Sequence, residues 1–370
     1  MENVKISSFQ LFTLIYIFIL GTTVIFPVGA DAKQAAWISI FFGLLSGLPL
    51  LLMYYYLNKQ YTNLLLTEYC IKILGKYIGT MIGILYILFF LYGAARDVRD
   101  VMELTPLFLY GTPSWAIAFM LILPILYGLY LGIEVIGRTS EIFFPYIVLT
   151  VILVVVFVIF SDLVKIENLR PITEPGWETV LRTTRKEAWM APFGEMICFT
   201  MIFAYLKKPK LILKVGVAGV VSSGLVLVLI HILIFSVLGS EARNTSIAPL
   251  LRMVQKINIG DIIQRLDAFF MIWLIVNVYF KVTVFMYAAV IGGATIFKVS
   301  KSYLVIPSGL IVFITSIFIA GSYTAHYAQS DFVLKNVYPI FAVYIPLLLC
   351  VVTFVRNKIK KRKPRSAENF

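Results

Sequence analysis

Long apolar runs separated by short polar segments dominate the chain. A helix needs about 20 apolar residues to cross a hydrocarbon core about 30 Å thick. Ten runs reach this length, at residues 9–30, 35–57, 80–104, 114–133, 142–160, 188–206, 211–238, 262–291, 303–322 and 337–355. Membrane strands would alternate apolar and polar residues, and these runs do not. The pattern predicts an all-α integral membrane protein with ten transmembrane helices.

Residues that break helices interrupt two of the ten runs. The first run contains Gly21, Thr22, Thr23 and then Pro27, and the sixth contains Ala191, Pro192, Phe193, Gly194 and Glu195. Proline lacks an amide hydrogen and clashes with the preceding turn, and glycine lets the backbone leave helical angles. Two ordinary kinks are the alternative, because both residues are frequent in membrane helices. Their matched positions favour two discontinuous helices.

Each interrupted run opens a set of five. Residues 1–183 hold the first set, 184–355 hold the second, and a basic cytoplasmic tail follows at 356–370. Because five is odd, the second set enters the membrane with the opposite orientation. The chain is therefore expected to form two inverted five-helix repeats of the LeuT type, with helices 1 and 6 discontinuous and a substrate site between the two breaks.

Composition and charge agree with a membrane protein. Hydrophobic residues make up 60% and charged residues 14% of the chain, whereas soluble domains have about 45–50% and 25%. This excludes a soluble enzyme or binding module. Of the 32 Lys and Arg residues, 18 fall on the side of the two termini and 10 on the opposite side. The bias predicts cytoplasmic termini, with the tail anchored at the lipid bilayer and no nucleic-acid partner.

Several motifs resemble those of the B-subunit, permease-like proteins of spore germinant receptors. The motifs are Gly21-Thr22 with Pro27, Asn168-Leu169 with Pro171, Pro192-Phe193-Gly194-Glu195, Ile257-Asn258-Ile259-Gly260-Asp261, Arg265-Leu266-Asp267, Trp273 and Lys281. Arg170 and the segment Ile247-Ala248-Pro249-Leu250 depart from the family pattern in outer loops. These departures bear on ligand identity and partner contacts more than on the fold.

The resemblance implies the fold of amino acid–polyamine–cation transporters and a nutrient-sensing role in the spore inner membrane. It also implies an A-type partner subunit and a lipoprotein C-type partner subunit. A small nutrient, most simply an amino acid, would bind at mid-membrane. A proton-coupled amino acid permease with the same site is the alternative. The expected substrate-binding residues are Gly21, Thr22, Thr23, Pro192, Phe193, Gly194, Glu195, Thr283 and Tyr287.

Lys281 lies well inside its apolar run, with Asn277 one turn earlier. Ionisable groups at this depth are costly and are usually paired or functional. In this fold class the segment packs near the first break, where sodium-coupled relatives hold an ion. We therefore expect the Lys281 ammonium to replace that cation by bonding to free carbonyls near Thr22 and Thr23, as a built-in cation or as a proton-responsive version of one. Snorkelling of Lys281 to an interface is the alternative.

Other polar residues within the spans leave two interpretations open. Arg96 and Asp100 lie four residues apart and share a helix face. They form either an ion-paired helix end or a gate over the site. Glu195 either bonds amide groups freed by the break or faces a ligand amine. His231 and His326 are not spaced for a metal or a catalytic triad, and His326 is expected in an outer loop. No phosphate-cradling loop or catalytic constellation is apparent in the sequence, so neither enzyme activity nor a cofactor or metal is expected.

Overall fold

Helices account for nearly all of the described chain. In this computed structural model the described residues are 4–24, 28–109, 111–172, 174, 176–258 and 266–362. Among them the only extended pairing is an isolated parallel bridge between Ile6 and Leu206. The all-helical prediction is confirmed for this part of the chain. Pro27, residues 259–265 and tail residues 363–370 lie outside the described residues, so the expectations attached to them stay predictions.

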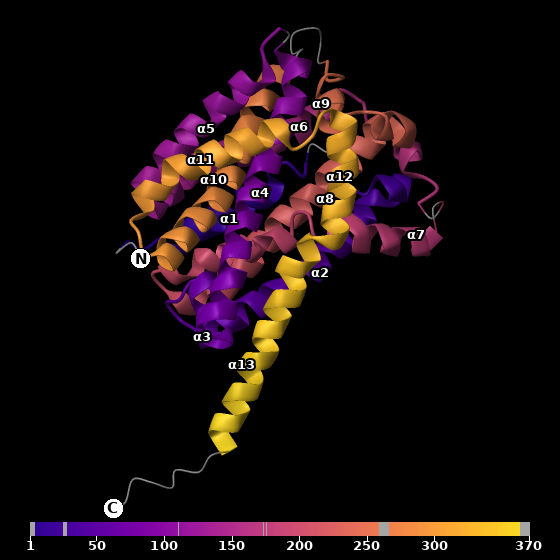
Figure 1. The fold of residues 1–370 in the computed structure, drawn as a ribbon. Coiled ribbons are helices and arrows are strands. Elements are labelled where there is room, and N and C mark those ends of the chain that lie inside the picture. The colour runs from indigo at the N-terminus through magenta and orange to yellow at the C-terminus, as the bar shows by residue number, and fades with distance from the viewer. Residues whose placement is uncertain are drawn as a thin grey trace, which may run out of the picture.

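The helices form one bundle from which α13 extends at one end (Figure 1). The α-helices are α1 (Ser8–Leu20), α2 (Ala36–Gln60), α3 (Leu66–Leu74), α4 (Lys76–Phe108), α5 (Ser114–Leu131), α6 (Ile133–Phe160), α7 (Gly176–Thr183), α8 (Ile212–Asn244), α9 (Pro249–Val254), α10 (Asp267–Phe297), α11 (Lys301–Phe318), α12 (Tyr323–Asn336) and α13 (Ile345–Arg362). Short 3₁₀ or π segments are η1 (Ala30–Ala35), η2 (Ile166–Leu169), η3 (Thr184–Ala188), η4 (Gly194–Met201), η5 (Phe203–Tyr205), η6 (Pro209–Leu211) and η7 (Ile340–Tyr344).

Eight helical stretches of the described chain are long and apolar enough to cross a membrane. They correspond to eight of the ten predicted runs. The other two runs are 9–30 and 188–206. The first holds the 13-residue helix α1, and the second holds turns followed by η4 and η5. The two runs with predicted breaks are thus the two without a continuous α-helix of spanning length.

Local chemistry fixes both ends of α1. The Ser7 hydroxyl accepts a bond from the Gln10 amide (3.0 Å), and the Gln10 side chain accepts one from the Ser7 amide (2.8 Å). This capping box satisfies amide groups that the first turn leaves free. The helix ends at Gly21, whose φ is +22°, and a Cβ there would lie 2.5 Å from Lys281 Cδ. Glycine is therefore required twice over, by its backbone angle and by the close lysine side chain.

The second interruption satisfies its own backbone. The Gly194 amide donates to the carbonyls of Trp189 (3.1 Å) and Met190 (2.9 Å), and the Glu195 amide donates to the Met190 carbonyl (3.3 Å). Irregular backbone at membrane depth is tolerated only when such groups find partners. After the turn, the chain continues as 3₁₀ segments rather than as the α-helical half that was expected.

Helix α2 holds this second interruption by close backbone approach. A Cβ on Gly43 would lie 2.3 Å from the Ala188 carbonyl oxygen, and one on Gly47 would lie 2.6 Å from Phe193 Cβ. The two glycines are four residues apart and share one face of α2, as small residues do where membrane helices pack closely. Their missing side chains leave the space that the turn at 189–193 fills.

The segment 323–336 corrects an expectation, because it forms helix α12 instead of an outer loop. With η7 and α13 it makes one helical stretch from Tyr323 to Ile359, 37 residues long. At 1.5 Å per residue this is about 55 Å, longer than the hydrocarbon core. The Ser322 hydroxyl caps its start by accepting a bond from the Ala325 amide (3.3 Å). The buried His326 therefore lies on a helix.

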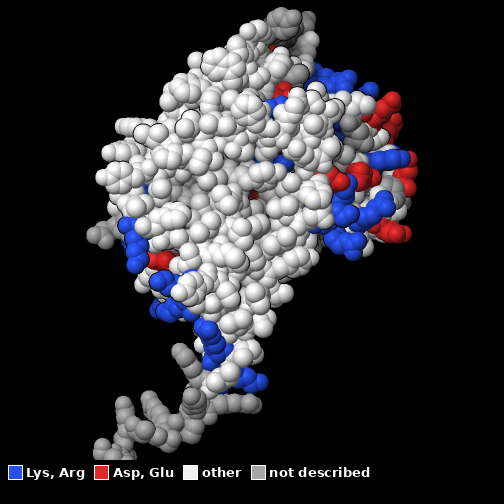
Figure 2. Space-filling view, viewed as in Figure 1, with Lys and Arg blue, Asp and Glu red and all other residues white. Residues whose placement is uncertain are grey.

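Uncharged side chains cover most of one face of the bundle. Figure 2 shows this white surface between basic groups at the lower left and mixed charges at the right. Many large apolar side chains of the bundle are exposed, including Met120 at 66%, Ile152 at 51% and Phe318 at 80%. Such an extended apolar surface is typical of contact with lipid.

Substituting Gly43 or Gly47 tests the close packing of α2 on the second interruption. We expect Gly43→Ala and Gly47→Ala each to destabilise the fold by about 1–3 kcal/mol, because the added methyl group has no room. The midpoint of thermal unfolding in detergent reports this. Gly321→Ala is the matched control, since a Cβ there meets no atom within 4 Å. Equal midpoints for all three variants would contradict the packing described.

Candidate functional site

A polar cavity of about 380 Å³ opens between the two interruptions. Its wall is formed by the turn after α1, the segment from η3 to Glu195, and helices α4, α10 and α12. Small-molecule pockets have volumes of about 300–1,000 Å³. The cavity therefore has the size for a small solute.

Lys281 forms the floor of the cavity together with two carboxylates. Its Nζ lies 2.8 Å from Glu195 Oε2 and 3.2 Å from Asp97 Oδ1. It also donates to the Thr22 hydroxyl (3.1 Å), which in turn donates to Asp97 Oδ1 (2.9 Å). The cluster joins α10, α4, the end of α1 and the second interruption.

The charged groups of this cluster are buried, so each of them needs a partner. Lys281 is 2% exposed and both carboxylates are 5% exposed. The ammonium also lies 5.8 Å from the centroid of the Phe18 ring. Isolated charges would be very costly here, whereas paired and hydrogen-bonded charges are tolerated. The Glu195 carboxylate is thus engaged by Lys281, while carbonyls of the turn bond the freed amide groups.

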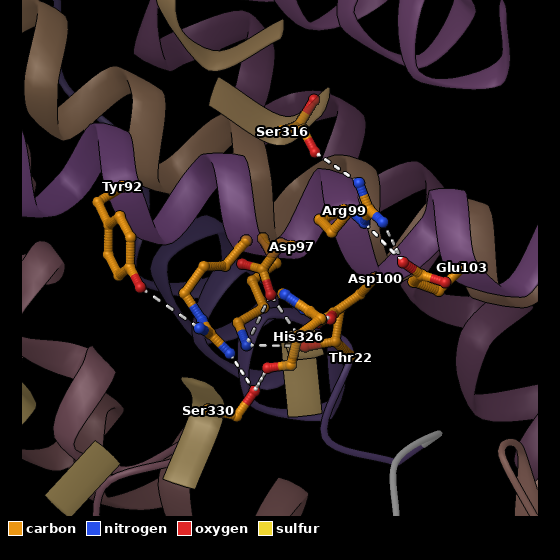
Figure 3. A network of polar contacts seen from close by, with 11 residues as sticks. Thr22, Tyr92, Asp97, Arg99, Asp100, Glu103, Ser316, His326 and Ser330 are labelled. Carbon is orange, nitrogen blue, oxygen red and sulfur yellow. Dashed lines mark hydrogen bonds and ion pairs between the residues drawn. The ribbon is translucent and has the colours of Figure 1, made fainter. Parts of the chain in front are cut away.

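Side chains of α4 and α12 contact one another directly beside the cavity, at Arg96 with Ser330 and at Asp100 with His326 (Figure 3). The Arg96 guanidinium donates to the Ser330 hydroxyl and to the Tyr92 hydroxyl (3.4 Å). Asp100 Oδ1 lies 2.7 Å from His326 Nε2. Arg96 and Asp100 therefore both contact α12, which differs from the mutual ion pair that their spacing favours.

A second ion cluster lies farther along the cavity, around Lys186. Its Nζ lies 2.8 Å from Asp331, 3.1 Å from Asp31 and 3.7 Å from Glu187. Burial by itself lowers the pKa of Lys186, but the hydrogen bonds to Asp331 and Asp31 outweigh it and raise this pKa above its ordinary value. Burial raises the pKa of the Glu187 carboxyl, which accepts a bond from the Gly29 amide (3.0 Å). These contacts tie α12 to η1 and η3.

The cavity contains some of the predicted site residues and not others. Those that line it are Thr22, Thr23, Arg96, Asp100, Glu195 and Lys281. Those outside its lining are Gly21, Pro192, Phe193, Gly194, Asn277, Thr283 and Tyr287. Thr283 donates to the Tyr279 carbonyl (2.6 Å), and Asn277 donates to the Trp273 carbonyl (2.7 Å). Both side chains satisfy the backbone of their own helix.

Two features of the cavity lay outside the sequence predictions. The first is the carboxylate of Asp97. A buried lysine needs an acidic partner, so the few carboxylates within the apolar runs were the candidates for the partner of Lys281. The second is α12. Its cavity residues recur at helical spacing, at Tyr323, His326, Tyr327, Ser330, Asp331 and Leu334. This stripe indicates a helix with one polar face.

Comparison with known proteins adds an independent result. The profile of a family described as spore germination protein matches residues 5–324. The chain is 35% identical over 369 residues to spore germination protein KB of Bacillus subtilis (strain 168), across 98% of both chains. It is 30% identical to spore germination protein YndE over 88% of both chains, and 25% identical to spore germination protein A2 over 85% of this chain and 86% of that one, both from the same organism. These relatives are germination proteins rather than members of an enzyme class.

Replacing Lys281 tests the ion cluster. Lys281→Met leaves two carboxylates without their cation, and we expect a loss of about 3–5 kcal/mol of stability. The triple variant Lys281→Met, Asp97→Asn, Glu195→Gln should recover part of this loss, since it removes the unpaired charges. Thermal unfolding in detergent measures both, with Lys214→Met at an exposed position of α8 as control. A Lys281→Met protein as stable as the control would show that the cluster is not an ion pair.

Proposed function

The chain belongs to the spore germination protein family, as its motifs indicated, and on that premise we propose that it is a nutrient-binding subunit of a germinant receptor. A small nutrient, an amino acid, binds in the cavity between the two interruptions. Binding triggers germination together with A-type and lipoprotein C-type partner subunits. The eight apolar helices and the family make the chain a multi-pass membrane protein.

The polar lining of the cavity is the observation that carries this proposal. An amino acid brings an ammonium and a carboxylate, and the cavity presents both kinds of partner. Asp97, beside the ion-paired Glu195, offers an anion, and Arg96 offers a cation, all at a depth where ionisable groups are usually functional. A few convergent polar groups in a concave site are what fix the orientation of a small ligand.

The proposal extends to the architecture. Residues 1–183 and 184–355 would form two inverted five-helix repeats, ten spans in all, with the irregular crossings opening each repeat. The interruptions at 21–24 and 189–193 support this because each lies in the first crossing of its half. Both termini would lie in the cytoplasm, beneath the spore inner membrane, in keeping with the excess of basic residues on that side.

Signalling then follows from a shift between two arrangements of the bundle. A ligand moves such an equilibrium only by its differential affinity for the two states. The polar contacts of α12 with Arg96 and Asp100 are those that a ligand between α4 and α12 would exchange for its own. The resulting displacement would pass to the partner subunits.

A proton-coupled amino acid permease is the second candidate. The observation that favours it is the buried group of Lys281, Asp97 and Glu195, in which one ammonium faces two carboxylates. One ammonium compensates only one of the two carboxylates. The remaining negative charge is balanced by a proton or by a ligand cation. Exchange of one for the other would couple proton movement to solute movement.

Glu195→Gln tests the receptor role. The test uses spores that carry this variant as their only subunit of this type. We expect the nutrient concentration for a half-maximal response to rise at least about tenfold, because the variant removes one anion of the site. Release of spore contents after nutrient addition measures the response. Glu134→Gln, an ion-paired residue on the surface of α6, is the matched control. A normal response at a normal protein level would contradict the placement of the site.

Uptake separates the two candidates. The purified chain in liposomes should bind but not accumulate a labelled amino acid if it is a receptor subunit alone. Accumulation driven by an imposed proton gradient would favour the permease. Lys281→Met should abolish that accumulation if the buried cluster carries the proton.

A further inference from the structure

Lys281 already occupies the polar groups at the end of α1. The Lys281 ammonium donates a hydrogen bond to Thr22 Oγ1 and lies within ion-pair distance of Asp97 Oδ1 and Glu195 Oε2. Its aliphatic stem fills the space beside Gly21. A ligand ammonium must therefore find an acceptor other than those at the first interruption.

The second oxygen of Asp97 is such an acceptor. Asp97 Oδ2 is buried and has no hydrogen-bond donor among the described residues. Asp97 itself lines the cavity. A buried carboxylate oxygen without a donor costs free energy, which a donor from a ligand would recover.

Donors for a carboxylate lie on the same wall. A guanidinium has five N–H groups, more than the contacts of the cavity-lining Arg96 to Tyr92 and Ser330 use. His326 bonds Asp100 through Nε2, while its buried Nδ1 has no partner in the described chain. A doubly protonated imidazole donates through both of its ring nitrogens.

We propose that the ligand is an α-amino acid whose ammonium binds Asp97 Oδ2 and whose carboxylate binds Arg96 and His326. Side chains of α4 and α12 thus bind the two charged groups of the ligand, and the interrupted backbone does not. Arg96 and Asp97 both line this cavity, so both side chains border the space that a small ligand would fill. This inference rests on the proposed function and adds to it the orientation of the ligand.

The remaining wall indicates an uncharged ligand side chain. Val28, Leu334 and Tyr338 supply apolar and aromatic surface to the cavity. The charge of Lys186 is already engaged by Asp31 and Asp331. A ligand with a third charge would have to break these pairs.

Truncated ligands test the orientation. L-alanine, L-valine, L-leucine and L-asparagine are offered to the full-length chain in lipid nanodiscs, and binding is measured by calorimetry. For the tightest binder, the matching amine and the matching carboxylic acid are then measured. We expect each truncation to weaken wild-type binding about 10- to 100-fold, as for loss of a charged hydrogen bond.

The variants assign each end of the ligand. Arg96→Gln should weaken binding of the amino acid about 10- to 100-fold but leave the affinity for the amine unchanged. Asp97→Asn should weaken the amino acid similarly and leave the carboxylic acid unchanged. Arg96→Lys should recover part of the loss, because lysine restores the positive charge but lacks the paired N–H donors of the planar guanidinium. Arg99→Gln is the matched control, since Arg99 pairs with Glu103 outside the cavity lining.

The outcomes separate this inference from the function it rests on. Equal weakening of all three probes by Arg96→Gln and Asp97→Asn would overturn the assigned orientation and leave nutrient binding intact. Absence of binding by every probe to the wild-type chain would overturn the proposed amino acid ligand itself. If either variant fails to fold, His326→Gln removes the second carboxylate donor and is judged by the same ratio of amino acid to amine affinity.

Discussion

An ammonium held between two carboxylates in the apolar centre of the bundle is the constraint on which the rest of the structure depends. Lys281, Asp97 and Glu195 come from α10, α4 and the second interruption, and Thr22 adds the end of α1. Removing these charges from water is repaid only when all the partners are in place. Segments far apart in sequence are therefore fixed relative to one another, and two stretches of irregular backbone keep a defined position.

Sequence patterns were sufficient for features that depend on local chemistry. The helix break at Gly21 and the turn before Gly194 follow from residues whose backbone limits act within a few positions. The nearness of Lys281 to Thr22 was predicted from depth and fold class, although the contact is with the hydroxyl. Asp97 was missed because pairing across helices depends on rotation about the axis of α4, which spacing alone does not fix.

Helix α12 shows a different limit. The residues of its polar face, which line the cavity, are as polar as those of solvent-exposed segments. The mean hydropathy of the segment is therefore that of a loop. The helical spacing of Tyr323, Tyr327 and Asp331 carried the signal. An average over a window discards this periodicity, so a helix facing a polar cavity inside a membrane protein is missed where a helix facing lipid is not.

The division of charges within the cavity bears on the sensing role proposed above. The floor is internally paired through Lys281, so a ligand that binds above it need not supply the charge that holds the interruptions in place. The contacts between α4 and α12 are different, because Arg96 with Ser330 and Asp100 with His326 are hydrogen bonds between side chains of two helices. Hydrogen bonds of this kind exchange for bonds to a ligand at little net cost. In the proposed receptor, a small solute would shift α12 by exchanging the contacts between α4 and α12, while the ion cluster of Lys281 would hold the rest of the site in place.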